Sequence, residues 1–157
     1  MKHTFYFIIS ILTSTCLYHG CGDDPVKSGG GNNNIADTSI LRTDEFGNIL
    51  YGDTTDWCYN NPPPGFSFFP AYPNPCTGII YARFYIPADD TIKLYIKESS
   101  GTEHVYVNSY LMAGTYTYTI KDTINEFRNT YQRLYITSKL YQQSAYCRFY
   151  GDIRFAE

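Results

Sequence analysis

The chain has 157 residues, a formal net charge of −3 and an aromatic content of 18%, with 17 Tyr and 10 Phe. This length suits one domain with a modest core. The mild acidity and the lack of a basic run argue against a nucleic-acid partner. Tyrosine favours pleated, half-buried surfaces, and 12 Gly and 8 Pro separate the aromatic runs. The composition therefore indicates an all-β protein.

The first two dozen residues predict export. Lys2 supplies a positive start, and residues 5–12 are apolar except for Ser10. The run is shorter than the roughly 20 apolar residues that span a bilayer, and the small residue Gly20 precedes Cys21. This order is typical of a secretory signal.

The Gly20-Cys21 junction also resembles a bacterial lipoprotein signal. The resemblance implies that residues 1–20 are removed and that Cys21 is lipidated, which would hold the protein to the outer membrane. The acids Asp23 and Asp24 resemble the export signal of surface lipoproteins, which implies possible surface exposure. The alternative is an ordinary cleaved signal that leaves Cys21 as a thiol.

A flexible tether is expected to follow the signal. Residues 22–34 read GDDPVKSGGGNNN and contain a single large apolar residue, Val26. Thirteen residues of this composition span about 20 Å root-mean-square. We therefore expect a lipidated cysteine and linker over residues 21–39 and a folded domain over 40–157.

The folded part is predicted to be strand after strand. Residues 40–43 and 49–51 flank a turn-rich stretch and predict a hairpin. Residues 60–65, NNPPPG, predict an extended crossing, because proline lacks the donor that a sheet requires. Period-2 alternation continues in residues 80–86, 92–97, 105–107, 115–120 and 134–136. Its inward residues include Ile92, Leu94 and Ile96, continued by Val105 and Val107. Residues 146–155 close the chain, with Gly151-Asp152 as a bend. About seven short strands predict an antiparallel β-sandwich.

Residues 69–84, FPAYPNPCTGIIYARF, carry a second resemblance, together with residues 92–96, Ser100-Gly101 and residues 113–116. They resemble the Ig-like β-sandwich of the flagellar hook-capping protein and of the C-terminal sorting domains of type IX secretion substrates. The resemblance covers residues 66–155 and implies an Ig-like sandwich. The Tyr-Pro-Asn-Pro segment should have an architectural role, with Asn74 bonding to main-chain groups. Type IX tails end in a short basic strand, which this chain lacks, so we expect the fold without the sorting function.

The cysteines predict one internal disulfide. Cys58, Cys76 and Cys147 follow Cys21, and three cysteines leave one thiol over. We favour the pair Cys58–Cys147, because it ties the start of the domain to its last strand. No Cys-x-x-Cys pair is present and His104 is the only histidine after Cys21, so we expect no metal site of the zinc type and no cofactor.

The sequence offers little chemistry. His104 is expected to be an isolated outward strand residue, and the usual hydrolase motifs are absent. Four acids could converge on calcium, but turn acids in solvent are the favoured interpretation. These acids are Asp44, Glu45, Asp53 and Asp56.

The tyrosines offer a candidate binding surface. Tyr81, Tyr85 and Tyr95 alternate with aliphatic residues and should lie on the opposite face. If that face is open, they form an aromatic patch with Arg83, Lys93 and Lys97 that could bind a glycan or a protein. The alternative is that the rings lie between the sheets or pair across strands. Trp57 is expected to plug the core.

We therefore predict a non-enzymatic envelope lipoprotein that presents a sandwich for protein or glycan binding. The alternatives are a structural accessory of an envelope machine, a type IX-like secretion tail and a hydrolase.

Overall fold

The structure, a computed structural model, describes residues 38–60, 65–122, 126–144 and 147–156. Within these ranges it contains nine strands and no helix. The predicted signal, Cys21, the tether and the proline crossing at 61–64 lie outside the described residues.

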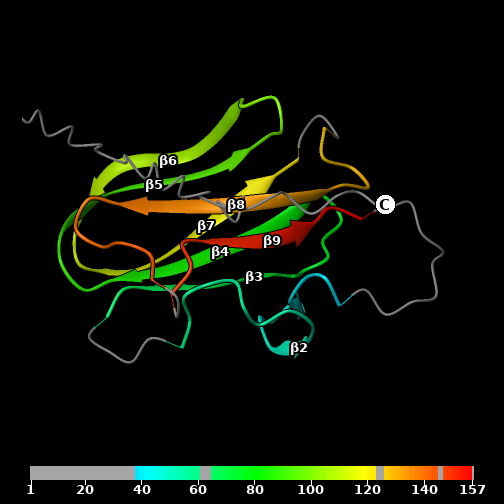
Figure 1. Ribbon diagram of the computed structural model, residues 1–157, viewed down its shortest axis with the longest axis horizontal. Helices are drawn as coiled ribbons and strands as arrows, with labels where there is room; N and C mark the ends of the chain where they lie inside the picture. The colour runs from blue at the N-terminus through cyan, green and yellow to red at the C-terminus, as the bar shows by residue number, and fades with distance from the viewer. Residues whose placement is uncertain (1–37, 61–64, 123–125, 145–146, 157) are drawn as a thin grey trace, which may run out of the picture.

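Seven strands form two antiparallel sheets, which confirms the predicted all-β sandwich (Figure 1). The three-stranded sheet has the order β3-β4-β7, with β3 (Ser67–Tyr72), β4 (Ile79–Ile86) and β7 (Gly114–Lys121). The four-stranded sheet has the order β6-β5-β8-β9. Its strands are β5 (Asp90–Lys97), β6 (Glu103–Leu111), β8 (Tyr131–Ser138) and β9 (Tyr150–Arg154).

The chain changes sheets three times within the sandwich. β5 and β6 form a hairpin in the four-stranded sheet, and β7 returns to pair with β4. In the immunoglobulin constant arrangement the fourth strand of the sandwich pairs with the fifth. Here the fourth strand, β6, pairs with the third, β5, so the topology is immunoglobulin-like with the fourth strand moved to the other sheet.

The core lies between the sheets and follows the predicted alternation. The inward residues of β4 and β5 are all fully buried. They are Ile80, Ala82, Phe84 and Ile86 from β4, and Ile92, Leu94 and Ile96 from β5. From β7, Tyr116 and Tyr118 stack on Phe84 at centroid distances of 5.6 and 5.8 Å. Removing this apolar area from water is the main stabilising contribution to the fold.

The prediction that Val105 faces the core is wrong. Val107 is buried opposite Leu94, but Val105 lies opposite Tyr95 and is 47% exposed. The pairing register shifts between Leu94 and Tyr95, so that Tyr106 is an extra residue in β6. A bulge of this kind moves the following side chains to the other face of the sheet.

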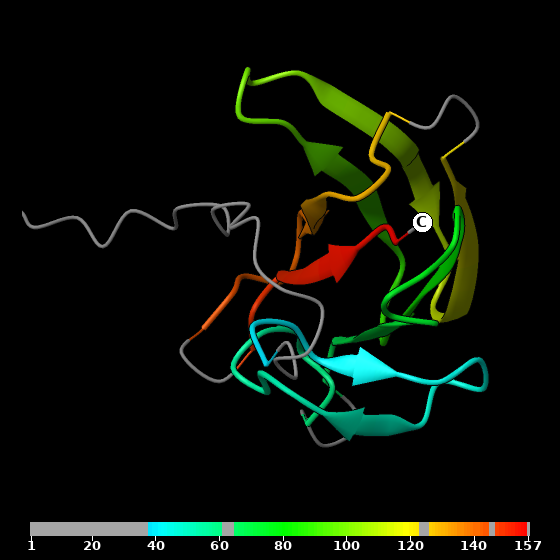
Figure 2. The ribbon, with the colours of Figure 1, turned by 90° about the vertical axis from the view of Figure 1, so that its right-hand side faces the viewer.

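The predicted first hairpin is present, as β1 (Arg42–Thr43) and β2 (Ile49–Tyr51) (Figure 2). Asp44 shapes its turn, because its carboxylate accepts hydrogen bonds from the backbone N–H groups of Phe46 and Asn48 at 2.9 and 2.8 Å. The Asn48 side chain donates to the same carboxylate, and these bonds lower the pKa of Asp44.

Asn74 is the central residue of the Tyr-Pro-Asn-Pro segment. The peptide bonds Tyr72–Pro73 and Asn74–Pro75 are cis, and Asn74 is fully buried. Its amide group donates to the carbonyls of Leu41 and Asp152 at 2.9 and 3.0 Å, and its Oδ1 accepts from the Arg154 N–H at 3.0 Å. The side chain therefore joins segments that are remote in the sequence, rather than only its neighbours.

Trp57 fills the core beside β9. It is buried, its φ is +66°, and its ring lies 4.9 Å from that of Phe68. A Cβ on Gly151 would come within 2.0 Å of the indole, so only glycine fits at that position.

Candidate functional site

The predicted single aromatic patch is wrong, because its members belong to different sheets. Tyr81, Arg83 and Tyr85 lie on β4, whereas Lys93, Tyr95 and Lys97 lie on β5. The inward neighbours of both sets meet in the core, so the two sets point away from each other on opposite outer faces. The alternation predicted the correct faces of β4 and β5 but could not say which sheet each of these strands joins.

On the three-stranded sheet the tyrosines pair locally. Tyr81 lies 5.4 Å from Tyr72 across the β3–β4 pair, and the Arg83 guanidinium lies 4.5 Å from the ring centre of Phe69. Threonines Thr115, Thr117 and Thr119 alternate along the exposed side of β7. Nothing on the described part of this face gathers these groups around a groove.

On the four-stranded sheet Tyr95 belongs to a continuous row of rings. Tyr95 is paired with Tyr135, and Tyr135 with Tyr150, in direct cross-strand register. The ring centroids are 5.3 and 6.1 Å apart. We call Tyr95, Tyr135 and Tyr150 the tyrosine row, and the exposed Val105 extends it onto β6. The predicted cross-strand pairing of rings is thus present, on an outer face.

Cations lie over both ends of the tyrosine row. Lys93 Nζ is 4.5 Å from the centre of the Tyr95 ring and also pairs with Glu103. The Arg133 guanidinium is 4.3 Å from the centre of the Tyr150 ring. Burial, and then the negative charge of Glu103, raise the pKa of Tyr95, so its hydroxyl stays protonated and can donate a hydrogen bond.

A groove of about 500 Å³ opens beside the tyrosine row. Its aromatic lining consists of Tyr95, Tyr135, Tyr141 and Phe149. Its polar lining consists of Thr137, Ser138, Gln142 and Gln143. A lining of aromatic side chains with a few hydroxyl and amide groups is the composition expected of a small-ligand site.

Hydrogen bonds of the buried Asp90 fix one wall of the groove. Its carboxylate accepts the hydroxyl of Ser138 and the backbone N–H groups of Lys139 and Leu140, at 3.2 and 3.3 Å for the latter two. Ser138 Oγ in turn accepts the Tyr141 N–H at 2.7 Å. These bonds stop β8 at Ser138 and direct the following residues back along the sheet.

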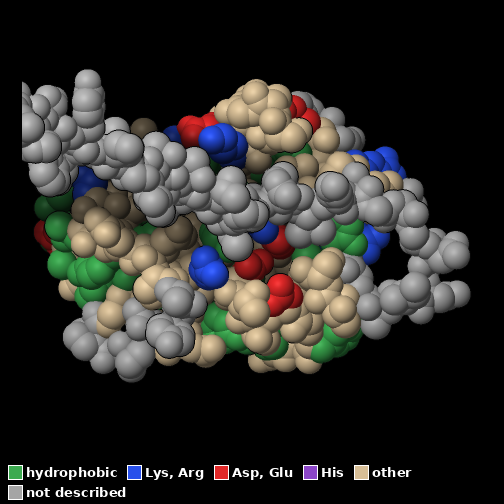
Figure 3. All heavy atoms as spheres, in the orientation of Figure 1, with side chains coloured by type: hydrophobic (Ala, Val, Ile, Leu, Met, Phe, Trp, Pro, Cys, Tyr) green, Lys and Arg blue, Asp and Glu red, His purple; other side chains and the backbone are tan. Residues whose placement is uncertain are grey.

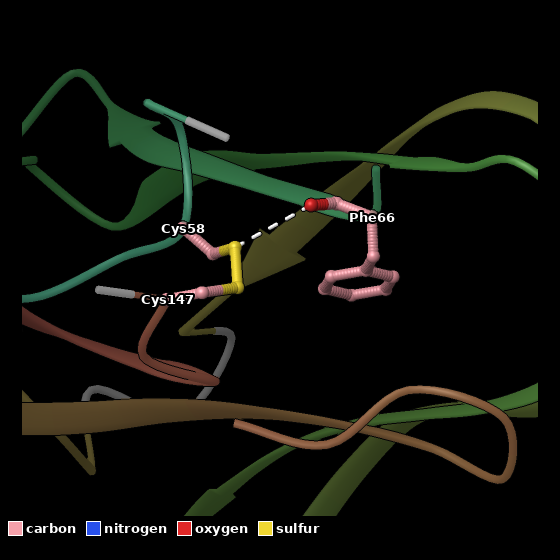
Figure 4. Close-up of a disulfide and its surroundings, with 3 residues drawn as sticks. All are labelled: Cys58, Phe66 and Cys147. Carbon is pink, nitrogen blue, oxygen red and sulfur yellow. Dashed lines mark hydrogen bonds between the residues drawn. A yellow bond between two sulfur atoms is a disulfide. The ribbon is translucent and has the colours of Figure 1, made fainter. Parts of the chain in front are cut away.

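Aromatic packing and a disulfide fix the other wall. Phe66 lies 5.7 Å from the Tyr141 ring and 4.6 Å from the Phe149 ring. Cys58 and Cys147 form a disulfide, the pairing favoured from the sequence, and Cys58 Sγ lies 3.4 Å from the Phe66 carbonyl oxygen (Figure 4). The groove residues of the β8–β9 connection are therefore attached to the core.

Cys76 is the remaining thiol of the described residues and is buried. Burial raises its pKa to about 11, so the group is a neutral thiol at neutral pH. A thiolate nucleophile at this position is therefore not favoured.

Buried charges support the tyrosine row from β8 and β9. Arg133 Nε and Nη2 donate to the Asp152 carboxylate at 2.7 and 3.0 Å, and these bonds raise the pKa of Arg133. Asp56 accepts the Asp152 N–H at 3.2 Å, and burial, followed by the charge of Asp152, raises the pKa of Asp56 to about 6. In Figure 3 acidic and basic side chains gather around β9.

The four candidate calcium ligands do not form a site. Asp44 and Asp53 each bond within their own turn, Asp53 to the N–H and hydroxyl of Thr55 at 2.8 and 2.7 Å. Asp56 differs from the predicted solvated acids, because it is buried against β9. Among the described residues, the one convergent group of possible metal-binding side chains excludes all four acids.

His104 is not isolated, which corrects the prediction from the sequence. It lies in β6 between Glu98 and Glu126, and its ring meets Phe127 edge-on at 5.0 Å. Sequence reasoning missed this group because the two acids come from separate turns.

Comparisons of the chain with protein-family models, curated proteins and solved structures found no match. The described part of the chain contains no helix that could cross a membrane. The function must therefore be argued from the groove and the tyrosine row.

Proposed function

We propose that this protein is a non-enzymatic, lipid-anchored protein of the bacterial outer membrane that binds carbohydrate on the outer face of its four-stranded sheet. The observation that carries the proposal is the tyrosine row beside a groove lined by Thr137, Ser138, Gln142 and Gln143.

The groove matches the chemistry of a sugar ring. A sugar presents C–H groups on its faces and hydroxyl groups around its rim. Tyr95 and Tyr135 contribute aromatic surface to the groove, and each retains part of its surface in solvent. The amides of Gln142 and Gln143 and the hydroxyl of Thr137 are exposed and can both donate and accept hydrogen bonds.

The proposed location rests on the sequence. The apolar run before Gly20 and the cysteine that follows it support lipidation of Cys21, and residues 22–34 would separate the domain from the membrane. A carbohydrate of the cell envelope or its surroundings is then within reach of the sandwich.

Affinity electrophoresis in gels containing envelope polysaccharides tests the binding. The full chain should be retarded, and Tyr135→Ala should weaken binding about tenfold or more, because a lost ring contact is worth about 1.4 kcal/mol or more. Tyr81→Ala is the matched control, since Tyr81 is also an outer-face tyrosine paired across strands, but on the other sheet. Equal losses in the two variants, or no retardation by any polysaccharide, would contradict the proposal.

Labelling of cells with a radioactive fatty acid tests the anchor. The wild-type chain should take up label, and Cys21→Ser should not. Protease treatment of whole cells should then degrade the labelled chain if it faces outward. An unlabelled wild-type chain that is released in soluble form would contradict lipid anchoring.

The β1–β2 hairpin favours a second candidate, a structural accessory of an envelope machine. Its apolar side chains are unusually exposed, with Phe46 at 77% and Leu50 at 57%, beside the exposed Ile49 and Tyr51. Exposed apolar patches often mark protein contacts. Mild cross-linking should then capture one stoichiometric partner that is lost in Leu50→Asp and kept in Tyr135→Ala; the reverse pattern would favour the tyrosine row.

A further inference from the structure

A second cluster of functional side chains lies at the end of the sandwich away from the groove. Glu98 follows β5, His104 lies in β6, and Glu126 precedes β8. Each offers one donor atom, and these atoms all lie within 4.8 Å of one another. The groove, by contrast, adjoins the opposite end of β8, at Thr137 and Ser138. The two sites therefore share no residue.

The imidazole is held between the two carboxylates. His104 Nε2 contacts Glu98 Oε1, and Nδ1 is 3.7 Å from Glu126 Oε2. The ring rests edge-on against the buried Phe127, which limits its rotation. All three donor side chains remain partly exposed, so an ion from solvent can reach them.

Asp122 fixes the position of Glu126. Its carboxylate accepts the N–H groups of Glu126 and Phe127 at 2.8 and 3.0 Å. These bonds order the turn that carries Glu126 and position the Phe127 ring, which packs against His104. The backbone that carries Glu126 is therefore held in place by Asp122.

The cluster carries more negative than positive charge. Among the described residues, the ion-pair partner of both Glu98 and Glu126 is His104, and no lysine or arginine pairs with either acid. Asp122 adds a further negative charge nearby. A single imidazolium cannot neutralise this group, whereas a divalent cation can.

We propose that Glu98, His104 and Glu126 bind a divalent cation of the zinc type. One imidazole nitrogen and two carboxylate oxygens form a three-ligand set of the kind that leaves the fourth tetrahedral position to water or another ligand. Bonds of about 2.0–2.2 Å to zinc place the donors about 3.4 Å apart. The three donor atoms now lie within 4.8 Å of one another, so the glutamate side chains must turn to reach that spacing.

The imidazole nitrogen distinguishes this site from a calcium site. Calcium takes six to eight oxygen ligands, and nitrogen is a poor ligand for it. Zinc, by contrast, commonly takes an imidazole nitrogen together with carboxylate oxygens.

Zinc titration of the full chain, followed by NMR of the histidine side chains, tests the site. Zinc should shift the ring resonances of His104, and calcium should not. Glu98→Gln or Glu126→Gln, which keep the side-chain shape, should weaken the zinc affinity read at His104 about tenfold or more. Glu103→Gln is the matched control, because Glu103 is a nearby acid on β6 that pairs with Lys93 instead.

Three results would overturn the proposal. These are zinc titration without a shift at His104, equal affinities in wild type and both cluster variants, or an equal response to calcium. The His104 resonances report this site alone, so zinc bound at a cysteine elsewhere in the chain does not affect the result. The outcome is also separate from carbohydrate binding, because no residue of the tyrosine row is changed.

Discussion

The two outer faces of the sandwich use similar residues differently. On the three-stranded sheet, Tyr81 pairs with Tyr72 and Arg83 covers Phe69 at the exposed surface. On the four-stranded sheet the equivalent contacts are linked, since Tyr135 joins two other rings and Arg133 is buried over Tyr150. The two faces therefore differ in the groups that contact the rings: an exposed arginine on the three-stranded sheet and a buried arginine on the four-stranded sheet.

On the four-stranded sheet, the connection that follows β8 contributes to a groove. The disulfide between Cys58 and Cys147 and the bonds of Asp90 hold that connection in place. The groove beside the tyrosine row therefore depends on residues distant in the sequence as well as on cross-strand aromatic pairs.

Loss of the buried arginine should give the largest effect. Arg133→Met should lower the free energy of unfolding by about 3–5 kcal/mol, because Asp152 would be left as a buried charge without its partner. Chemical denaturation at neutral pH measures this. A loss below about 1 kcal/mol would show that solvent reaches this part of the four-stranded face.

Loss of the disulfide should come next. Cys58→Ala should cost about 2–4 kcal/mol, since the bridge closes a chain separation of 89 residues. A reductant should destabilise the wild-type chain to a similar degree and leave Cys58→Ala unchanged. A wild type that resists reductant and tolerates the substitution would argue that the groove wall stands without the bridge.

Asp56 should make the four-stranded side sensitive to pH. Its pKa of about 6 exceeds the ordinary value of 3.8, so the folded state binds the proton more tightly than the unfolded state. The stabilisation that the protonated Asp56 gives to the folded state is fully present below about pH 4 and is lost as the pH rises through about 6. The free energy of unfolding of Asp56→Asn, relative to that of the wild type, should therefore rise by about 2 kcal/mol from pH 4 to pH 7. Denaturation at the two pH values checks this, and a pH-independent difference would contradict it.

The arginine of the three-stranded face should matter least. Arg83→Met should cost less than about 1 kcal/mol, because the cation over Phe69 is exposed to solvent. This variant is the counterpart of Arg133→Met, and both are measured in the same denaturation experiment. Equal losses would remove the contrast between the two faces.

Much of the strand pattern could be predicted from local alternation. Ile92, Leu94 and Ile96 gave the inward face of β5 directly, and the hairpin around Asp44 followed from its turn residues. These features depend on neighbours along the chain, which a single sequence displays.

The candidate sites depend on contacts between distant residues and were predicted only in part. The sequence points to Tyr95 but not to Tyr135 or Tyr150, because the pairing of β5 with β8 and of β8 with β9 is not visible in any one strand. The bulge that turns Val105 outward is equally hidden, since alternation assumes an unbroken register.

The central claim is that ligand binds on the four-stranded face. A direct test is to titrate the full chain with oligosaccharides derived from the polysaccharide that retards it in the gel. NMR of the backbone amide resonances then shows where they bind. The account predicts shifts at Thr137, Ser138, Gln142 and Gln143, with Thr115, Thr117 and Thr119 on the other sheet unchanged. Shifts confined to the threonines of β7 would contradict it.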